Sequence, residues 1–149
     1  PPLAQRLERW VESLRPAAPA RKEEAASVPP GLADALAELR SPDPELRAHA
    51  AACLGRAGDR AAVAPLLARL EDPDPDVRRY AADALGLLGD PRALPGLQAR
   101  LQDEDGWVRE WAAGALHRLG EDPRSLGYRG AYTLIDEDGV EQVVPAQAP

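Results

Sequence analysis

Four aspartates have the spacing of a calcium-binding loop. The stretch at 72–90 reads DPDPDVRRYAADALGLLGD, with Asp72, Asp74 and Asp76 at its first, third and fifth positions and Asp83 at its twelfth. A calcium loop of this kind also needs glycine at position six and a bidentate glutamate at position twelve. Val77 and Asp83 occupy those places. The pattern therefore favours helix capping by the aspartates over metal binding.

Other residue types that carry chemistry do not form a catalytic set. His49 and His117 lie far apart in the sequence, and the single cysteine, Cys53, lies in an alanine-rich segment. One cysteine excludes an internal disulfide and a cysteine-based zinc site. A cysteine nucleophile would need an activating base, and the sequence assigns none. We therefore predict no catalytic, cofactor-binding or metal-binding residues, and a protein that is not an enzyme.

Composition limits the possible partners. The 149 residues carry 25 acidic and 18 basic side chains, a net charge of −7, which argues against nucleic-acid binding. Phenylalanine and methionine are absent, and the alanine-rich composition suits closely packed helices. No apolar run reaches the length of a membrane span and no signal peptide is visible. We expect a cytoplasmic location.

A repeat of 31 residues organises the chain. The stretch at 72–90 aligns without gaps with SPDPELRAHAAACLGRAGD at 41–59 and with DEDGWVREWAAGALHRLGE at 103–121. The matched columns are Leu39, Leu70, Leu101; Asp43, Asp74, Asp105; Arg47, Arg78, Arg109; Ala51, Ala82, Ala113; Leu54, Leu85, Leu116; and Gly58, Gly89, Gly120. Each unit predicts two helices, the second beginning at a capping aspartate and ending near a glycine.

This pattern resembles the HEAT-like repeats of the phycobilisome-lyase type. The resemblance rests on DPDVRRYAADALGLLGD, on its two copies and on PRALPGLQARL, and it covers about residues 32–121. It implies an all-α fold, an α-solenoid of three two-helix repeats that usually binds other proteins. Some members belong to enzymes that attach bilin pigments to phycobiliproteins. A hydroxylase of this repeat family would carry His-Glu pairs as iron ligands, and the sequence contains none.

Together with the segments outside the repeats, the sequence predicts four parts. These are an amphipathic helix at 1–14, a linker at 15–30, the solenoid at 31–123 and a β-hairpin tail at 124–149. The helix either packs on the solenoid or docks in another protein's groove, and packing is favoured because apolar faces are most often core. A two-residue turn at Asp138-Gly139 would place Tyr132, Leu134 and Val143 on one apolar face. The hairpin either covers the last repeat or presents an edge to a partner.

Two columns of side chains raise further hypotheses. Arg47, Arg78 and Arg109 either bind anions or pair with carboxylates of neighbouring repeats, and the ladder is favoured. The acidic turns at 71–76 and 103–105 would form a rim that steers a partner with a basic surface.

The aromatic column His49, Tyr80 and Trp111, with Trp107 one turn earlier, is either the buried end of the solenoid or a contact surface. If a protein partner exists, we predict contact through Trp107, Trp111, Tyr80 and Arg118. The predicted function is a non-catalytic protein-interaction module, an adaptor or subunit of a larger assembly. The alternative is a bilin lyase or its helper subunit. The oligomeric state is left open.

Overall fold

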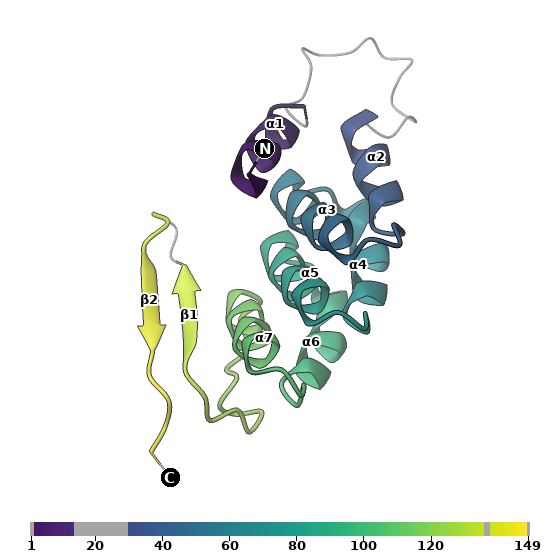
Figure 1. Ribbon diagram of the computed structural model, residues 1–149. Coiled ribbons are helices and arrows are strands. Elements are labelled where there is room, and N and C mark those ends of the chain that lie inside the picture. The colour runs from purple at the N-terminus through teal and green to yellow at the C-terminus, as the bar shows by residue number, and fades with distance from the viewer. Residues whose placement is uncertain (1, 14–29, 136–137, 149) are drawn as a thin grey trace.

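The structure, a computed structural model, describes residues 2–13, 30–135 and 138–148. Its helices form two rows (Figure 1). One row holds the first helix of each repeat: α2 (Pro30–Glu38), α4 (Val63–Arg69) and α6 (Leu94–Arg100). The other holds the second helices: α3 (Pro44–Ala57), α5 (Pro75–Leu88) and α7 (Gly106–Arg118). The predicted three-repeat α-solenoid is confirmed.

The aspartates of the repeats are helix caps, as predicted. The side chain of Asp43 accepts a hydrogen bond from the backbone of α3, and Asp74 and Asp105 each accept two from α5 and α7. Gly58 and Gly89 end α3 and α5 with φ of 71° and 66°, a left-handed conformation that side chains disfavour. Asp59 and Asp90 cap short 3₁₀ turns, η1 (Arg60–Ala62) and η2 (Pro91–Ala93), that lead into α4 and α6.

Leucine, valine and alanine fill the space between the rows. The matched leucines of the repeat are all buried, and small residues let the second helices approach closely. A Cβ atom added at Gly86 of α5 would lie 2.9 Å from the Cα of Ala115 in α7, the next helix of the same row. Cys53 is fully buried at a position that holds buried Ala84 and Ala115 in the other repeats. The thiol therefore fills an alanine-sized place in the core.

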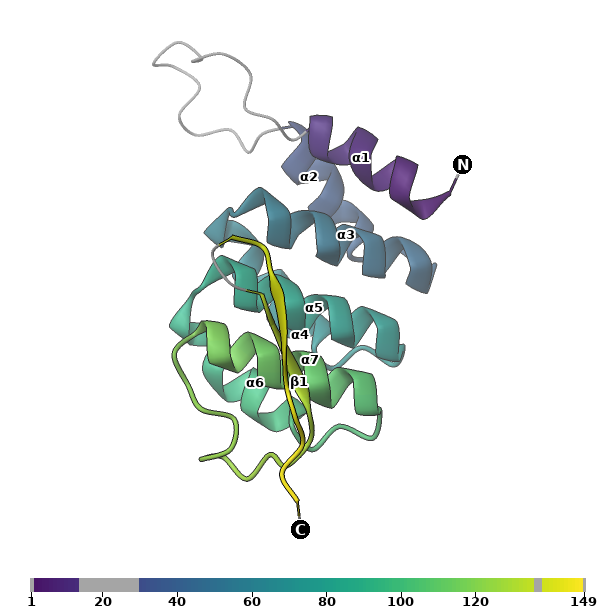
Figure 2. The same ribbon diagram turned by 90° about the vertical axis from the view of Figure 1, so that its left-hand side faces the viewer.

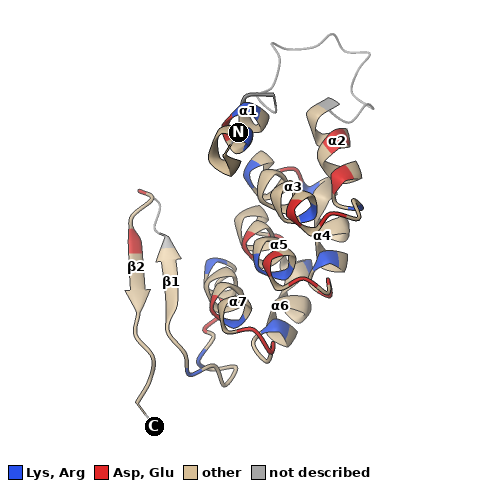
Figure 3. Cartoon of the chain, viewed as in Figure 1, with Lys and Arg blue, Asp and Glu red and all other residues tan. Residues whose placement is uncertain are grey.

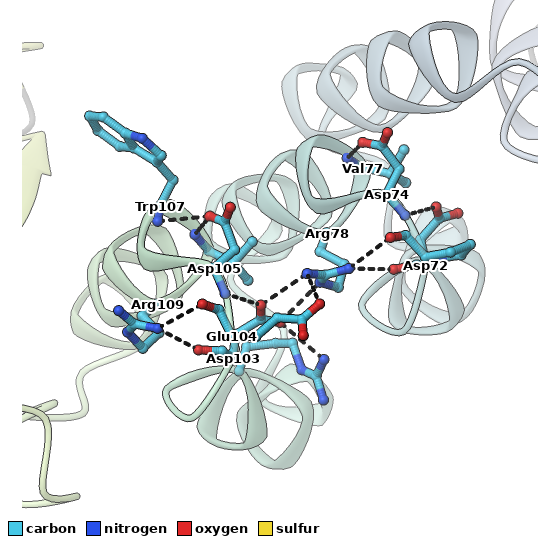
Figure 4. A network of polar contacts seen from close by, with 12 residues as sticks. Asp72, Asp74, Val77, Arg78, Asp103, Glu104, Asp105, Trp107 and Arg109 are labelled. Carbon is cyan, nitrogen blue, oxygen red and sulfur yellow. Dashed lines mark hydrogen bonds and ion pairs between the residues drawn. The ribbon is translucent and has the colours of Figure 1, made fainter.

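An arginine–aspartate ladder joins the repeats (Figure 4). Arg78 donates from Nε and Nη2 to the two carboxylate oxygens of Asp103, each at 3.0 Å. Arg47 makes the same pair of bonds to Asp72, at 2.9 and 3.0 Å. The predicted structural ladder is confirmed. Its carboxylates are not the capping aspartates, however, but the residues two positions before them, because each guanidinium reaches into the turn of the next repeat.

The ladder also changes the expected acidic rim. Asp72 and Asp103 are only 4% and 7% exposed. Arg69 and Arg100 add further ion pairs to them, both at 3.2 Å. Figure 3 shows these acidic turns beside arginines of both helix rows. Much of the acid in the turns is therefore neutralised within the fold and does not form a continuous free edge.

Different elements flank the row of second helices (Figures 1 and 2). Helix α1 (Leu3–Ser13) lies beside α3, with the Trp10 ring edge-on to the His49 ring at 5.7 Å. At the other end, strand β1 (Tyr132–Ile135) lies against α7, and β2 (Glu141–Val144) pairs with it on the far side. The predicted linker at 15–30 lies almost wholly outside the described residues.

The predicted register of the hairpin is wrong by one residue. Tyr132 pairs with Val144, and Thr133 pairs with Val143. Residues 136–140 therefore separate the strands, where a two-residue turn was expected. A connection of five residues instead of two shifts the pairing of the strands by one residue, and a shift of one residue moves each side chain of β2 to the opposite face of the hairpin. Val143 consequently lies on the face opposite Tyr132 and Leu134 and is 67% exposed, while Tyr132 is buried.

Candidate partner-binding site

An aromatic cluster forms where α5 and α7 lie side by side. The rings of Tyr80 and Trp111 meet edge to face, with centroids 5.6 Å apart. The guanidinium carbon of Arg79 lies 5.0 Å from the Tyr80 ring centroid and 5.1 Å from that of Trp111. Trp107, one turn before Trp111, is 61% exposed. Its ring points away from the arginine–aspartate ladder in Figure 4.

A cavity of about 420 Å³ lies between α5, α7 and the hairpin. We call it the hairpin groove, and its lining includes Trp107, Glu110, Trp111, Asp83, Arg118 and Glu141. The carbonyl oxygen of Thr133 would lie 2.8 Å from a Cβ at Gly114, so only glycine lets β1 approach α7 this closely. The strand thereby supplies one wall of the groove.

The structure brings the four predicted contact residues onto one side of the row of second helices. Trp107, Trp111 and Arg118 line the hairpin groove, and Tyr80 reaches it through its contact with Trp111. Arg118 donates from Nη1 to Asp83 at 3.0 Å. Burial raises the pKa of the Asp83 carboxyl, although the charge of Arg118 opposes that rise. Arg118 therefore also ties α7 to α5.

A second cavity, of about 550 Å³, opens between α1, α3 and α5. Leu3 and Leu7 of α1, His49 of α3 and Tyr80 of α5 are among its lining residues. Tyr80 thus lies between the two cavities. The sequence identified Tyr80 but not this cavity, because the placement of α1 beside α3 depends on residues far apart in the chain.

A buried contact between Cys53 and His49 was also missed. The sulfur lies 3.8 Å from Nε2 of His49, and Nδ1 of His49 lies 3.9 Å from a carboxylate oxygen of Glu38. The four-residue spacing of His49 and Cys53 on one helix was the available signal. Burial raises the pKa of Cys53 to about 11 and lowers the pKa of His49. The thiol is therefore protonated at neutral pH and is a poor nucleophile.

Two further features of the described residues concern metal binding and membrane insertion. Within 2–13, 30–135 and 138–148, no three histidine, cysteine or acidic side chains form a group suited to a metal ion. The helices over the same ranges are too short or too polar for any of them to cross a bilayer.

Comparison with known proteins identifies the repeats. A profile for HEAT repeats matches residues 30–126. The solved structure of the complex of CpcE and CpcF of phycocyanin lyase from Nostoc sp. PCC7120 is similar, with 37% identity and a TM-score of 0.58 over 71% of this chain and 43% of that chain. Human deoxyhypusine hydroxylase in complex with glycerol is similar with 26% identity and a TM-score of 0.57, over 79% of this chain and 44% of that chain. A search of curated protein sequences found no match.

These neighbours correct one prediction. The expectation that the chain is not an enzyme is wrong, because the 37% identical structure belongs to a lyase and the second similar structure is a hydroxylase. The absence of a recognisable catalytic set in the sequence was a poor guide, since both of these similar structures are of enzymes. The chain spans less than half the length of either neighbour. The HEAT profile covers well over half of the chain, and the chain therefore belongs to the HEAT-repeat family.

Proposed function

We propose that this protein is a subunit of a bilin-lyase-type enzyme, in which its repeats bind a partner protein. The observation that carries the proposal is the 37% identity to the CpcE and CpcF complex of phycocyanin lyase over 71% of this chain. That neighbour is a complex of two proteins, so the proposal assigns this chain a protein partner as well.

The aromatic cluster and the hairpin groove support a contact surface on the second helices. Trp107, Trp111, Tyr80 and Arg118 are its central residues in this proposal. Tryptophan, tyrosine and arginine are the residue types most enriched in binding hot spots. Trp111 and Tyr80 are half-buried and held by each other and by Arg79, so they are already ordered before a partner binds.

Two experiments test the function. Affinity capture from the native source, read by mass spectrometry, identifies the partner and supplies the complex. The complex is then incubated with a bilin and an apo-phycobiliprotein, and covalent attachment is followed by visible absorption after denaturation. We expect an adduct to form faster than in a control without the complex. Equal rates in both reactions would reject the lyase assignment.

A matched pair of variants tests the contact surface separately. Replacing Trp107 and Trp111 by alanine should weaken partner capture, whereas replacing Gln98, an exposed residue of α6 in the other helix row, by alanine should leave capture unchanged. Circular dichroism and thermal melting confirm that each variant is folded. Unchanged capture by a folded double variant would place the contact elsewhere.

A further inference from the structure

Trp107 occupies a position where the other repeats carry an acid. Glu45 and Asp76 are its equivalents, each two residues after the capping aspartate of its helix. A carboxylate there is favoured by the positive end of the helix. An indole that remains 61% exposed gains little from burial. The stability of the fold therefore does not account for Trp107.

The second repeat shows what the third one lacks. In α5, Asp76 holds the guanidinium of Arg79 at 3.1 Å, and that guanidinium lies over the aromatic ring of Tyr80. An acid, a cation and an aromatic ring thus come from one helix. In α7 the equivalent positions are Trp107, Glu110 and Trp111. This set again holds an acid and aromatic rings, but a carboxylate stands where α5 has its cation.

Two carboxylates of the hairpin groove stand apart from the ion pairs of the described residues. Glu110 of α7 accepts only a hydrogen bond from Thr133, at 3.4 Å, and neither Glu110 nor Glu141 of β2 forms an ion pair within the part of the chain that the structure describes. The cations that also line the groove, Arg56 and Arg118, both act on Asp83. The lining as a whole holds three acids, Asp83, Glu110 and Glu141, against Arg56 and Arg118, so it carries a net charge of −1 beside an exposed indole.

We infer that the hairpin groove receives an arginine or lysine side chain of the partner protein, placed over Trp107 and between Glu110 and Glu141. This inference rests on the proposed function, because it names the chemistry of the partner at the same surface. A cation over a tryptophan face is attracted by the ring, and it gains more where carboxylates lie beside it. Arg79 already lies 5.1 Å from the Trp111 ring centroid, so the exposed Trp107 ring is the one left for the cation of the partner.

The test uses the full chain and two synthetic peptides. The probe is acetyl-Leu-Arg-Leu-amide, and its control is the same peptide with citrulline, which has the shape of arginine without its charge. Binding is followed by the indole N–H signals in nuclear magnetic resonance spectra. The sequence has three tryptophans, and Trp10 lies on α1 at the other end of the molecule, so it serves as an internal reference.

We expect the arginine peptide to shift the signals of Trp107 and Trp111 but not that of Trp10. It should bind about twofold to fivefold more tightly than the citrulline peptide, the range for a cation over an exposed aromatic ring. Raising the salt concentration from about 50 mM to about 500 mM should reduce this preference. Replacing both Glu110 and Glu141 by glutamine should reduce this preference, because only the Trp107 ring then attracts the cation. The control Glu71→Gln, at an exposed turn residue outside the groove, should retain the preference in full.

Three results would overturn the inference: no shift of Trp107 or Trp111, equal binding of the two peptides, or a preference that is undiminished in the folded double variant. The assay needs neither a pigment nor a partner protein. A failed pigment-attachment experiment therefore leaves it intact, and equal binding of the peptides rejects the cation site without rejecting the lyase proposal.

Discussion

At the scale of single residues, Trp107 is the position at which the proposed binding can be tested apart from folding. A glutamate at this position would restore the pattern of the first two repeats, with an acid in the first turn of the helix. We expect Trp107→Glu to melt at the same temperature as the parent chain or slightly higher, while partner capture is lost. The measurement is thermal melting beside affinity capture. A large drop in melting temperature would show that the indole is part of the folded core.

Asp103 should make stability depend on acid pH. Burial by itself raises the pKa of this carboxyl, but two hydrogen bonds from Arg78 and one from the backbone of Asp105 outweigh burial and hold the pKa below its usual value. A lowered pKa contributes stability above the unfolded pKa of about 4, and this contribution disappears as pH falls through the lower folded value.

The variant Asp103→Asn tests this. We expect its melting temperature to lie below that of the parent chain at neutral pH, and the difference to narrow as the pH falls below about 4. The exposed control Glu71→Gln should change the melting temperature little at neutral pH. A difference that stays constant across the acid range would contradict the assigned pKa direction.

At the scale of elements, the close approach of the second helices sets the spacing of the repeats. A Cβ at Gly86 would meet the backbone of Ala115, which cannot move without shifting α7. We expect Gly86→Ala to destabilise the chain by about 1–3 kcal/mol, the usual range for overpacking. Denaturant unfolding measures this change.

Gly96→Ala is the matched control. Its added Cβ would meet the Cδ1 atom of Leu70, the flexible end of a side chain that can turn aside. Alanine also favours the helical conformation over glycine by about 1 kcal/mol. The control should therefore be close to neutral or stabilising. Equal losses in the two variants would mean that contact with the Ala115 backbone does not determine the effect.

The elements also show which features a sequence can predict. The repeat, its capping aspartates and its terminal glycines were predicted correctly, because they depend on neighbours a few residues away. The hairpin register was not, because a connection of five residues and one of two fit the same flanking sequence around Asp138-Gly139. The arginine ladder was predicted, but its carboxylates were not assigned, since Arg78 could reach either aspartate of the next turn.

The candidate site was predictable to a similar degree. The periodicity placed Tyr80, Trp107 and Trp111 on one side of their helices. The wall formed by β1, and the contribution of Glu141 from β2, depend on how the tail folds back over α7. Tertiary placement of that kind leaves no local pattern in the sequence.

The whole molecule is a short stack whose two end elements contribute unequally. A solenoid needs its terminal repeats covered, because each repeat buries its apolar face only against a neighbour. At the hairpin end, Tyr128 and Tyr132 are 9% and 4% exposed, and Tyr128 donates a hydrogen bond to the carbonyl of Ala131. At the other end, α1 covers α3 mainly through half-buried Leu7, Trp10 and Val11.

Truncation after Gly127 tests this asymmetry. It removes both buried tyrosines and exposes the face of α7 around Gly114, so we expect a lower melting temperature or self-association of the exposed surface. Removal of residues 2–13 is the matched control, and its smaller buried surface predicts a smaller loss of melting temperature. Melting curves and light scattering at several concentrations distinguish destabilisation from association. If the truncated chain stays monomeric and melts like the parent, the hairpin is dispensable for folding. Its contact with α7 would then matter only as a wall of the hairpin groove.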